Sequence, residues 1–387
     1  MRVLFTSTPA VGHVHPMVPL ARAFREQGDR VSWTTAATVC PALVAEGFEA
    51  FPAGSGADES RQQFYDQFPE HAELTPAEGP AFMFPRLFGT IRAPRMLDEL
   101  MPIVRKLKPD VIVHDANEFA GPIAAAVAGV PSVTHSFGAL SPVERVAAAG
   151  DAVAPLWEAN GLTPCPYAGN YEFLYLDIYP RSLRSGSWDH VPRVQPLRPV
   201  GFALPGDEPV PQWPAQMQEL PLVYVTFGTV FNRDISAWSR VVAGLRDLPV
   251  RLIVTVGPSG DPSALGPQPV NVHVARYIPQ SQVLGSASAV VSHAGSGTFL
   301  ATLARGLPQL CLPQGADQFG NASACSRAGA GLEIQPGDLT TDSVRDAASR
   351  LFAEPEFRSR ARQLADEIAQ MPTPDTVAAQ IRTTYKS

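Results

Sequence analysis

Short apolar segments alternate with helical patterns along the chain, and this alternation limits the fold more than any other feature. In the first half, strand-like runs such as RVLFTS (2–7) and PDVIVHD (109–115) are separated by helices, the clearest of which spans about Pro16 to Gln27. The same rhythm returns after residue 221, in LVYVTFGT, VRLIVTVG and AVVSHAG. Such alternation is typical of βαβ units and parallel sheets. The sequence therefore predicts an α/β protein with two Rossmann-like, doubly wound domains that face each other across a cleft.

A proline-rich stretch separates the two halves. LPGDEPVPQWPAQMQELP (204–221) contains five prolines and no periodic apolar face, which is typical of an extended linker. A length of 387 residues also favours two domains. The expected organisation is an N-terminal domain over 1–204, a linker over 205–220, a C-terminal domain over 221–370, and a final helix within 371–387 that packs back on the N-terminal domain.

Composition narrows the class of protein. The net charge of −7 comes without a basic block, which argues against nucleic acid as the main partner. No apolar run approaches the roughly 18 residues of a membrane span, and the chain begins with a strand-like run rather than a signal peptide. The four cysteines are scattered, without metal-ligand spacing. We expect a cytoplasmic protein with no metal site; the oligomeric state, including a homodimer, is left open.

Two segments, 55–90 and 139–170, interrupt the alternation. They are interpreted as long loops, and their aromatic side chains favour an apolar substrate pocket over simple packing. The acceptor-binding side chains predicted from these segments and from the strand end near residue 135 are Phe82, Phe84, His135 and Phe137.

The stretch SHAGSGTFLATLARG (292–306) places glycines where a strand gives way to a helix. Free N–H groups and the positive end of the helix dipole at Thr298 suit a phosphate, although an ordinary tight turn remains an equal alternative. The nicotinamide-binding pattern GxGxxG is incomplete, because Leu300 stands at the third glycine position, and the loop of nucleoside triphosphatases is absent.

Further candidate ligand-binding residues lie at strand ends of the second half. Each is more often a packing or capping residue, but all fall at one edge of a sheet, where doubly wound folds bind ligands. They are Gly228, Thr229, Tyr277, His293, Asp317 and Gln318.

Together, RYIPQSQVL, VSHAGSGT and LPQGADQ resemble the donor signature of nucleotide-sugar-dependent glycosyltransferases with the GT-B fold, and most closely the bacterial transferases that glycosylate polyketides and other secondary metabolites. The resemblance extends over essentially the whole chain. It implies that Tyr277, Ile278 and Gln280 lie by the base and ribose, and that Asp317 and Gln318 hold the sugar. The diphosphate would be held by Thr229, His293, Gly295, Ser296, Gly297 and Thr298. Gly228, next to Thr229, is predicted as a donor-binding residue without a more specific role.

The chain departs from the family pattern at two positions. Tyr277 stands where the family often has Trp, and Ser292 precedes His293 where many bacterial members have a second histidine. The acidic residue of the signature does not by itself identify the sugar.

In the first half, GHVHP places His13 after the first strand, and Asp115 ends the strand VIVHD. Both positions lie at the same sheet edge, so an imidazole–carboxylate pair is predicted, although His13 could instead cap its helix. The resemblance implies that His13 is the general base and Asp115 orients it.

The expected reaction is the inverting, metal-independent transfer of a sugar or deoxysugar from a nucleoside-diphosphate sugar to a hydroxyl of a small apolar aglycone such as a polyketide. A dTDP-sugar is favoured over a UDP-sugar as the donor. No cofactor is implied. Two alternatives stay open: a GT-B nucleotide-sugar epimerase, and a non-catalytic nucleotide-sugar-binding partner protein.

Overall fold

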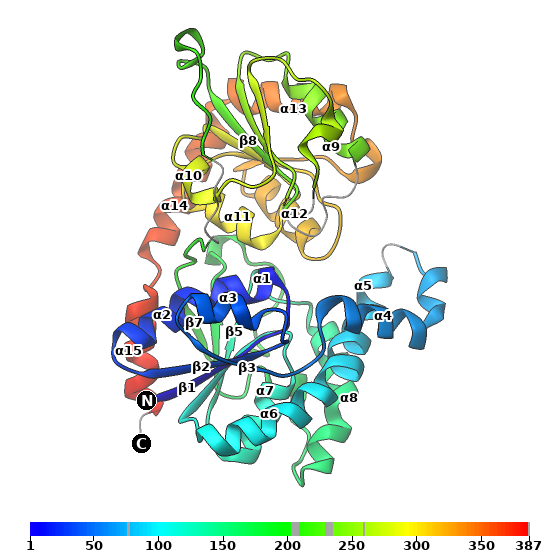
Figure 1. The fold of residues 1–387 in the computed structure, drawn as a ribbon, viewed down its shortest axis with the longest axis vertical. Coiled ribbons are helices and arrows are strands. Elements are labelled where there is room, and N and C mark those ends of the chain that lie inside the picture. Colours follow the sequence, from blue (N-terminus) through cyan, green and yellow to red (C-terminus); the bar gives the residue numbers. More distant parts are fainter. Residues whose placement is uncertain (76–77, 203–208, 229–234, 258–259, 386–387) are drawn as a thin grey trace. The chain divides into compact units, whose positions relative to one another are not determined.

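The computed structural model describes residues 1–387 except 76–77, 203–208, 229–234, 258–259 and 386–387. The chain forms two compact units. Unit 1 comprises Met1–Ile178, Ser185–Arg198 and Pro372–Ser387, and unit 2 comprises Tyr179–Arg184 and Pro199–Met371. Figure 1 shows a parallel sheet with helices in each unit.

The sheet of unit 1 is entirely parallel. In spatial order its strands are β3 (Glu49–Pro52), β2 (Arg30–Thr35), β1 (Arg2–Thr6), β4 (Val111–Asp115), β5 (Ser132–His135), β6 (Leu174–Asp177) and β7 (Val194–Pro196). The central strands are buried because helices cover the sheet, which explains the apolar runs of β1 and β4, whereas the edge strands β3 and β7 are partly exposed. The order reverses between β1 and β4, so their carboxyl ends form the switch point where ligands bind in such sheets.

The helices of unit 1 follow the strands. They are α1 (Val11–Val14), α2 (Val18–Glu26), α3 (Cys40–Ala45), α4 (Ala57–Gln67), α5 (Gly79–Phe84), α6 (Ala93–Leu107), α7 (Ala120–Ala128), α8 (Val143–Ala159) and α15 (Pro374–Tyr385). A π-helical segment, Pro85–Arg92, joins α5 to α6. The final helix α15 packs on α2, where Arg382 bonds to Asp29 and to the carbonyl of Gln27.

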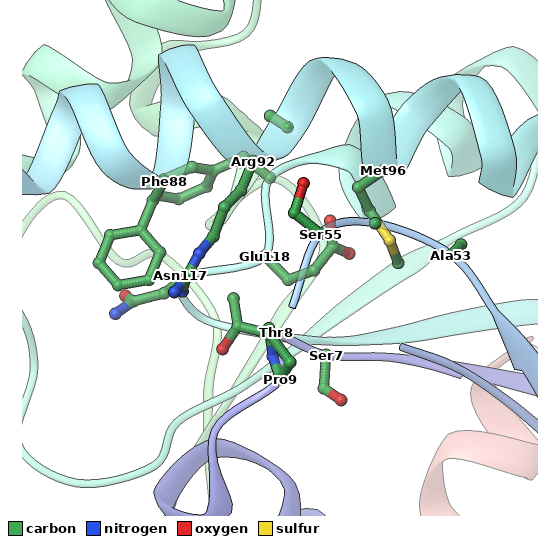
Figure 2. A pocket seen from close by; sticks show the side chains of 13 residues that line it. Ser7, Thr8, Pro9, Ala53, Ser55, Phe88, Arg92, Met96, Asn117 and Glu118 are labelled. Carbon is green, nitrogen blue, oxygen red and sulfur yellow. The ribbon is translucent and has the colours of Figure 1, made fainter. Parts of the chain in front are cut away.

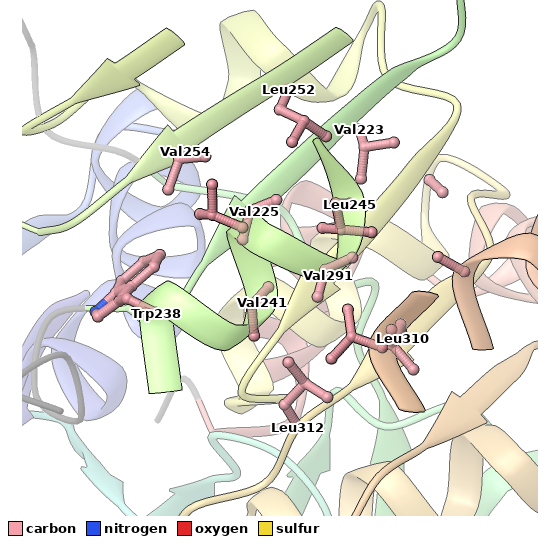
Figure 3. Close-up of a cluster of buried hydrophobic side chains, with 14 of the residues drawn as sticks. Val223, Val225, Trp238, Val241, Leu245, Leu252, Val254, Val291, Leu310 and Leu312 are labelled. Atoms are coloured by element: carbon pink, nitrogen blue, oxygen red, sulfur yellow. The ribbon is translucent and has the colours of Figure 1, made fainter. Parts of the chain in front are cut away.

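Unit 2 repeats this design with six parallel strands. They are β10 (Val272–Ala275), β9 (Arg251–Thr255), β8 (Leu222–Thr226), β11 (Ala289–Ser292), β12 (Gln309–Cys311) and β13 (Gly331–Glu333). The helices are α9 (Ile235–Leu245), α10 (Gln280–Leu284), α11 (Ser296–Leu303), α12 (Gln318–Arg327), α13 (Thr341–Ala353) and α14 (Pro355–Gln370). Figure 3 shows Trp238, Val241 and Leu245 of α9, which pack against side chains of the sheet. Each such side chain contributes about 1.5–3 kcal/mol by burial.

The predicted long loops are wrong, because both segments are largely helical. Residues 57–67 form α4, and 143–159 form α8, which buries Val146, Val153 and Trp157 along one face. The spacing of these apolar residues is that of a helix, and the alanines between them favour one.

The predicted domain limits also need correction. Residues 179–184 belong to unit 2, because Tyr179 stacks on Phe299 and donates to Asn321 Oδ1 over 3.1 Å. The described part of the expected linker is also in unit 2, since Val210 and Trp213 pack against its hydrophobic core.

Candidate active site

His13 and Asp115 lie together at the switch point of unit 1. His13 is on α1, directly after β1, and Asp115 ends β4, the neighbouring strand. The Nδ1 atom of His13 is 2.9 Å from both carboxylate oxygens of Asp115. The predicted imidazole–carboxylate pair is therefore present.

Three further donors fix the carboxylate. Thr8 donates from its hydroxyl (2.7 Å) and its N–H (3.3 Å), and Asn117 donates from its N–H (3.2 Å). Burial alone would raise the pKa of Asp115, but the charge of His13 and these hydrogen bonds hold it below its ordinary value. The ionised carboxylate can only accept, so Nδ1 of His13 carries a proton and, in the neutral ring, Nε2 is unprotonated. That nitrogen is suited to remove a proton from a bound hydroxyl.

Aromatic rings surround this pair, though not all the expected ones. Phe137 lies 4.1 Å and Phe88 6.3 Å from the His13 ring, centroid to centroid. Phe88 was predicted only as part of the aromatic content of its segment, whereas Phe137 was singled out.

The structure does not bring Phe82, Phe84 and His135 to this surface. Phe82 packs under Arg86, 3.6 Å from its guanidinium carbon, because its helix turns it toward another aromatic cluster. Phe84 belongs to the core, and His135 is fully buried at the end of β5 with Nδ1 against the carbonyl of Ser136. Phe84 and His135 are too buried for the expected contact with an acceptor, whereas that of Phe82 stays a prediction.

Glu118 is a buried carboxyl next to the pair that the sequence did not single out. It accepts hydrogen bonds from the N–H groups of Ala120 and Gly121, at the start of α7, and from the Thr6 hydroxyl. Burial outweighs these contacts and raises the pKa of Glu118 to about 7. The carboxyl is therefore partly neutral at physiological pH.

This shift predicts that the contribution of Glu118 to the free energy of unfolding falls as pH rises. Between the ordinary pKa of a glutamate and about 7, the unfolded chain ionises Glu118 before the folded one does, so stability is highest at low pH and is lost through pH 7. Glutamine does not titrate, so Glu118→Gln lacks this pH dependence. From pH 5 to pH 8, the difference in unfolding free energy between Glu118→Gln and the wild type should therefore rise by about 2–3 kcal/mol in favour of the variant. Urea unfolding at both pH values measures it, and a pH-independent difference would contradict the assignment.

In unit 2 the turn between β11 and α11 is built around His293. A Cβ at Gly295 would lie 2.5 Å from Nε2 of His293, and one at Gly228, whose φ is +71°, would lie 2.6 Å from its Cε1. Both glycines are therefore required by the close approach of the ring. Ala294 has φ +61°, an uncommon conformation for a non-glycine residue and one that marks functional turns.

His293 is neutral in this setting. Burial lowers its pKa to about 4, against the opposing effect of the Asp317 charge. A neutral imidazole can still donate one hydrogen bond. Among the described residues, the N–H groups of Gly297 and Thr298 in the first turn of α11 have no hydrogen-bond partner. These donors and the helix dipole can accept an anion.

Ser296 differs from the expectation. Its hydroxyl (2.5 Å) and N–H (3.2 Å) both donate to Oδ2 of Asp317, so they position this carboxylate rather than standing free for a diphosphate. Asn321, which the sequence did not single out, adds a third donor to the same oxygen. Gln318 accepts from the N–H groups of Gln314 and Gly315, which fixes its amide next to Asp317.

The predicted base-binding residues are placed as follows. Tyr277 and Gln280 are half-buried around the start of α10. Ile278 is 1% exposed and packs in the core, so its side chain cannot contact a base and only its backbone can. Thr229 lies outside the described residues.

The described residues contain neither a metal-binding cluster nor a membrane-spanning helix. No group of three or more His, Cys, Asp or Glu side chains there is placed to hold a metal ion. Within the same residues, no helix is long and apolar enough to cross a bilayer.

Thr8, Asn117, Glu118 and Asn321 are the residues that sequence reasoning missed. Their positions next to strand ends were visible, but small polar residues are common there, and only the folded sheet shows that Thr8 and Asn117 serve one carboxylate.

Both halves of the chain match one family. Residues 22–149 match the N-terminal domain, and residues 239–383 the C-terminal domain, of the erythromycin biosynthesis protein CIII-like (EryCIII-like) family.

Full-length relatives agree with this match. The chain is 32% identical to the L-demethylnoviosyl transferase of Streptomyces niveus, over 98% of this chain and 97% of that protein. It is 33% identical to the elloramycin glycosyltransferase ElmGT of Streptomyces olivaceus, over 100% and 98%. The fold is similar to that of the glycosyltransferase SsfS6 of Streptomyces sp. SF2575, solved with thymidine diphosphate, with a TM-score of 0.79, 26% identity and 99% coverage of each chain.

Proposed function

The chain belongs to the EryCIII-like glycosyltransferases of bacterial secondary metabolism, with the two Rossmann-like domains of the GT-B fold, and we propose that it is an inverting, metal-independent enzyme. In this proposal it moves a sugar, typically a deoxysugar, from a dTDP-sugar to a hydroxyl of a small apolar aglycone such as a polyketide. The observation that carries the proposal is the His13–Asp115 pair, with Nδ1 bonded at 2.9 Å and Nε2 left as a base.

The acceptor is activated by His13. Nε2 takes the proton of the acceptor hydroxyl while its oxygen attacks the anomeric carbon of an α-linked donor from the face opposite the diphosphate, so the configuration inverts. The new carbon–oxygen bond forms as the bond to the β-phosphate breaks, and the diphosphate leaves with the electron pair. Asp115 stabilises the imidazolium that results, since its charge faces Nδ1.

The leaving diphosphate is stabilised in unit 2. The N–H groups of Gly297 and Thr298, the dipole of α11 and the neutral donor His293 all favour negative charge at one place. We propose that these groups replace a divalent cation, so activity should survive EDTA. Asp317 and Gln318 would bind the sugar hydroxyls through the polar atoms that Ser296, Asn321, Gln314 and Gly315 leave free.

Thymidine diphosphate is the proposed nucleotide, because SsfS6 was solved with it. We expect calorimetric titration to give micromolar binding of dTDP, and weaker binding of UDP. His293→Ala should weaken dTDP binding about tenfold, because it removes a hydrogen bond to a charged group. Thr298→Ala keeps the N–H of this residue and removes its hydroxyl, which we propose as a further donor to the diphosphate, so it should weaken binding several-fold.

The matched control is His273→Ala, which removes a half-buried histidine from β10 of the same unit. It should leave dTDP affinity unchanged. If His293→Ala and Thr298→Ala also bind dTDP like the wild type, the phosphate assignment is wrong.

A further inference from the structure

A small cavity lies next to the residues that hold Asp115. Its volume is about 20 Å³, and Figure 2 shows the polar side chains that reach it from strand ends and from the end of the π-helical segment. Among its lining residues are Thr8, Phe88, Arg92, Asn117 and Glu118. A volume of this size holds one water-sized group. The cavity can therefore take a single substituent of a bound molecule but not a ring.

Arg92 supplies hydrogen-bond donors to this cavity. Its Nε donates to the Ser60 hydroxyl over 2.9 Å, and its guanidinium carbon lies 5.0 Å from the centre of the Phe88 ring. Its two terminal nitrogens have no hydrogen bond or carboxylate partner among the described residues. Burial lowers the pKa of Arg92 to about 10, so the guanidinium is still charged at neutral pH. A half-buried guanidinium without a partner is stabilised by an oxygen atom that accepts a hydrogen bond from it.

Asn117 supplies an acceptor in the same place. Its N–H donates to Asp115, the residue is 5% exposed, and its Oδ1 has no donor among the described residues. Arg92 and Asn117 both line this cavity, and Figure 2 shows their two side chains. A buried polar atom without a partner is costly, which points to a group that completes the site.

A group that fits this cavity must accept from Arg92, donate to Asn117 Oδ1 and be no larger than a water molecule. A hydroxyl meets all three requirements. We propose that Arg92 and Asn117 form a specificity-determining subsite for a second, non-glycosylated hydroxyl on a planar aromatic acceptor. The inference rests on the proposed function in one respect, namely that unit 1 binds the acceptor. Phe88 and Phe137, whose rings both lie near that of His13, offer ring faces for the aromatic body.

The test compares matched phenols as ligands of the wild-type protein. The probes are 2-naphthol, the 1,5-, 2,6- and 2,7-naphthalenediols, and the monomethyl ether of each diol. We expect at least one diol to bind about tenfold more tightly than 2-naphthol, and methylation of its second hydroxyl to remove that gain. Calorimetric titration measures the dissociation constant of each probe and requires no turnover.

The variants assign the gain to residues. Arg92→Met should bind the preferred diol and 2-naphthol equally, Arg92→Lys should keep part of the preference, and Asn117→Ala should reduce it several-fold. The control is Arg86→Met, because Arg86 is also half-buried and stacked on an aromatic ring, but does not line the cavity. It should keep the full preference.

Three results would overturn the subsite: no diol that binds better than 2-naphthol, a preference that survives Arg92→Met, or equal losses for all probes in that variant. Titration of the same protein samples with dTDP separates this failure from failure of the proposed function. Intact dTDP binding with no preference among phenols removes the subsite alone.

Discussion

Replacing His13 by alanine is expected to lower kcat for transfer to a hydroxyl acceptor by about 10³-fold, the usual contribution of a positioned general base. The side chain is 15% exposed and only its Nδ1 is engaged, by Asp115, so the variant removes the base without opening a large core cavity. The Kd for dTDP should stay within a few-fold, because the proposed phosphate donors lie on unit 2.

Steady-state kinetics and calorimetry on one sample measure both quantities. His71→Ala is the control, since His71 is a half-buried histidine of unit 1 outside the site and should leave kcat unchanged. Equal loss of transfer and of dTDP binding in His13→Ala would make His13 structural rather than catalytic.

Asp115→Asn should be nearly as damaging, with kcat lower by about 10²- to 10⁴-fold. The carbonyl oxygen of the new amide can accept from Thr8 or Asn117, which leaves its NH₂ facing His13. Nδ1 would then accept and Nε2 would carry the proton, so the ring could no longer remove one from the acceptor. The change reverses the tautomer while the shape of the site is kept.

Nitrogen-15 NMR of the His13 ring distinguishes this effect from simple unfolding. We expect Nδ1 to be protonated in neutral His13 of the wild type and Nε2 in Asp115→Asn. A variant that keeps the wild-type tautomer and the wild-type kcat would show that Asp115 does not position the base.

The parallel cores were predictable because their strands are short, apolar and bounded by turn residues. This holds for β1, β4, β8 and β11. The strands β6 and β7 were not predicted, because LYLD and VQP are too short to show a pattern. Their strand conformation depends on pairing with neighbouring strands, β6 with β5 and β7 with β6, which the sequence does not show. α8 was missed although its apolar spacing is helical.

The site shows a similar division. Adjacent strand ends were enough to predict that His13 and Asp115 meet, and the glycines around His293 were visible as a turn. The partners of a buried group were not, since they come from separate segments: Asp317 is held by Ser296 from 21 residues away, and the cavity combines Arg92 with Asn117. Ile278 shows the reverse error, because a residue within a motif can carry its side chain into the core.

The most direct test of the central claim is proton NMR of the complete reaction, with a dTDP-α-hexose panel, a hydroxylated aromatic polyketide and EDTA. We predict that dTDP is released only when the acceptor is present and that the new glycoside has the opposite anomeric configuration to the donor. Conversion of the sugar nucleotide to its epimer without acceptor would contradict this and favour an epimerase. Retention of configuration would contradict the role of His13 in a single displacement, and binding of dTDP without any turnover would favour a non-catalytic partner protein.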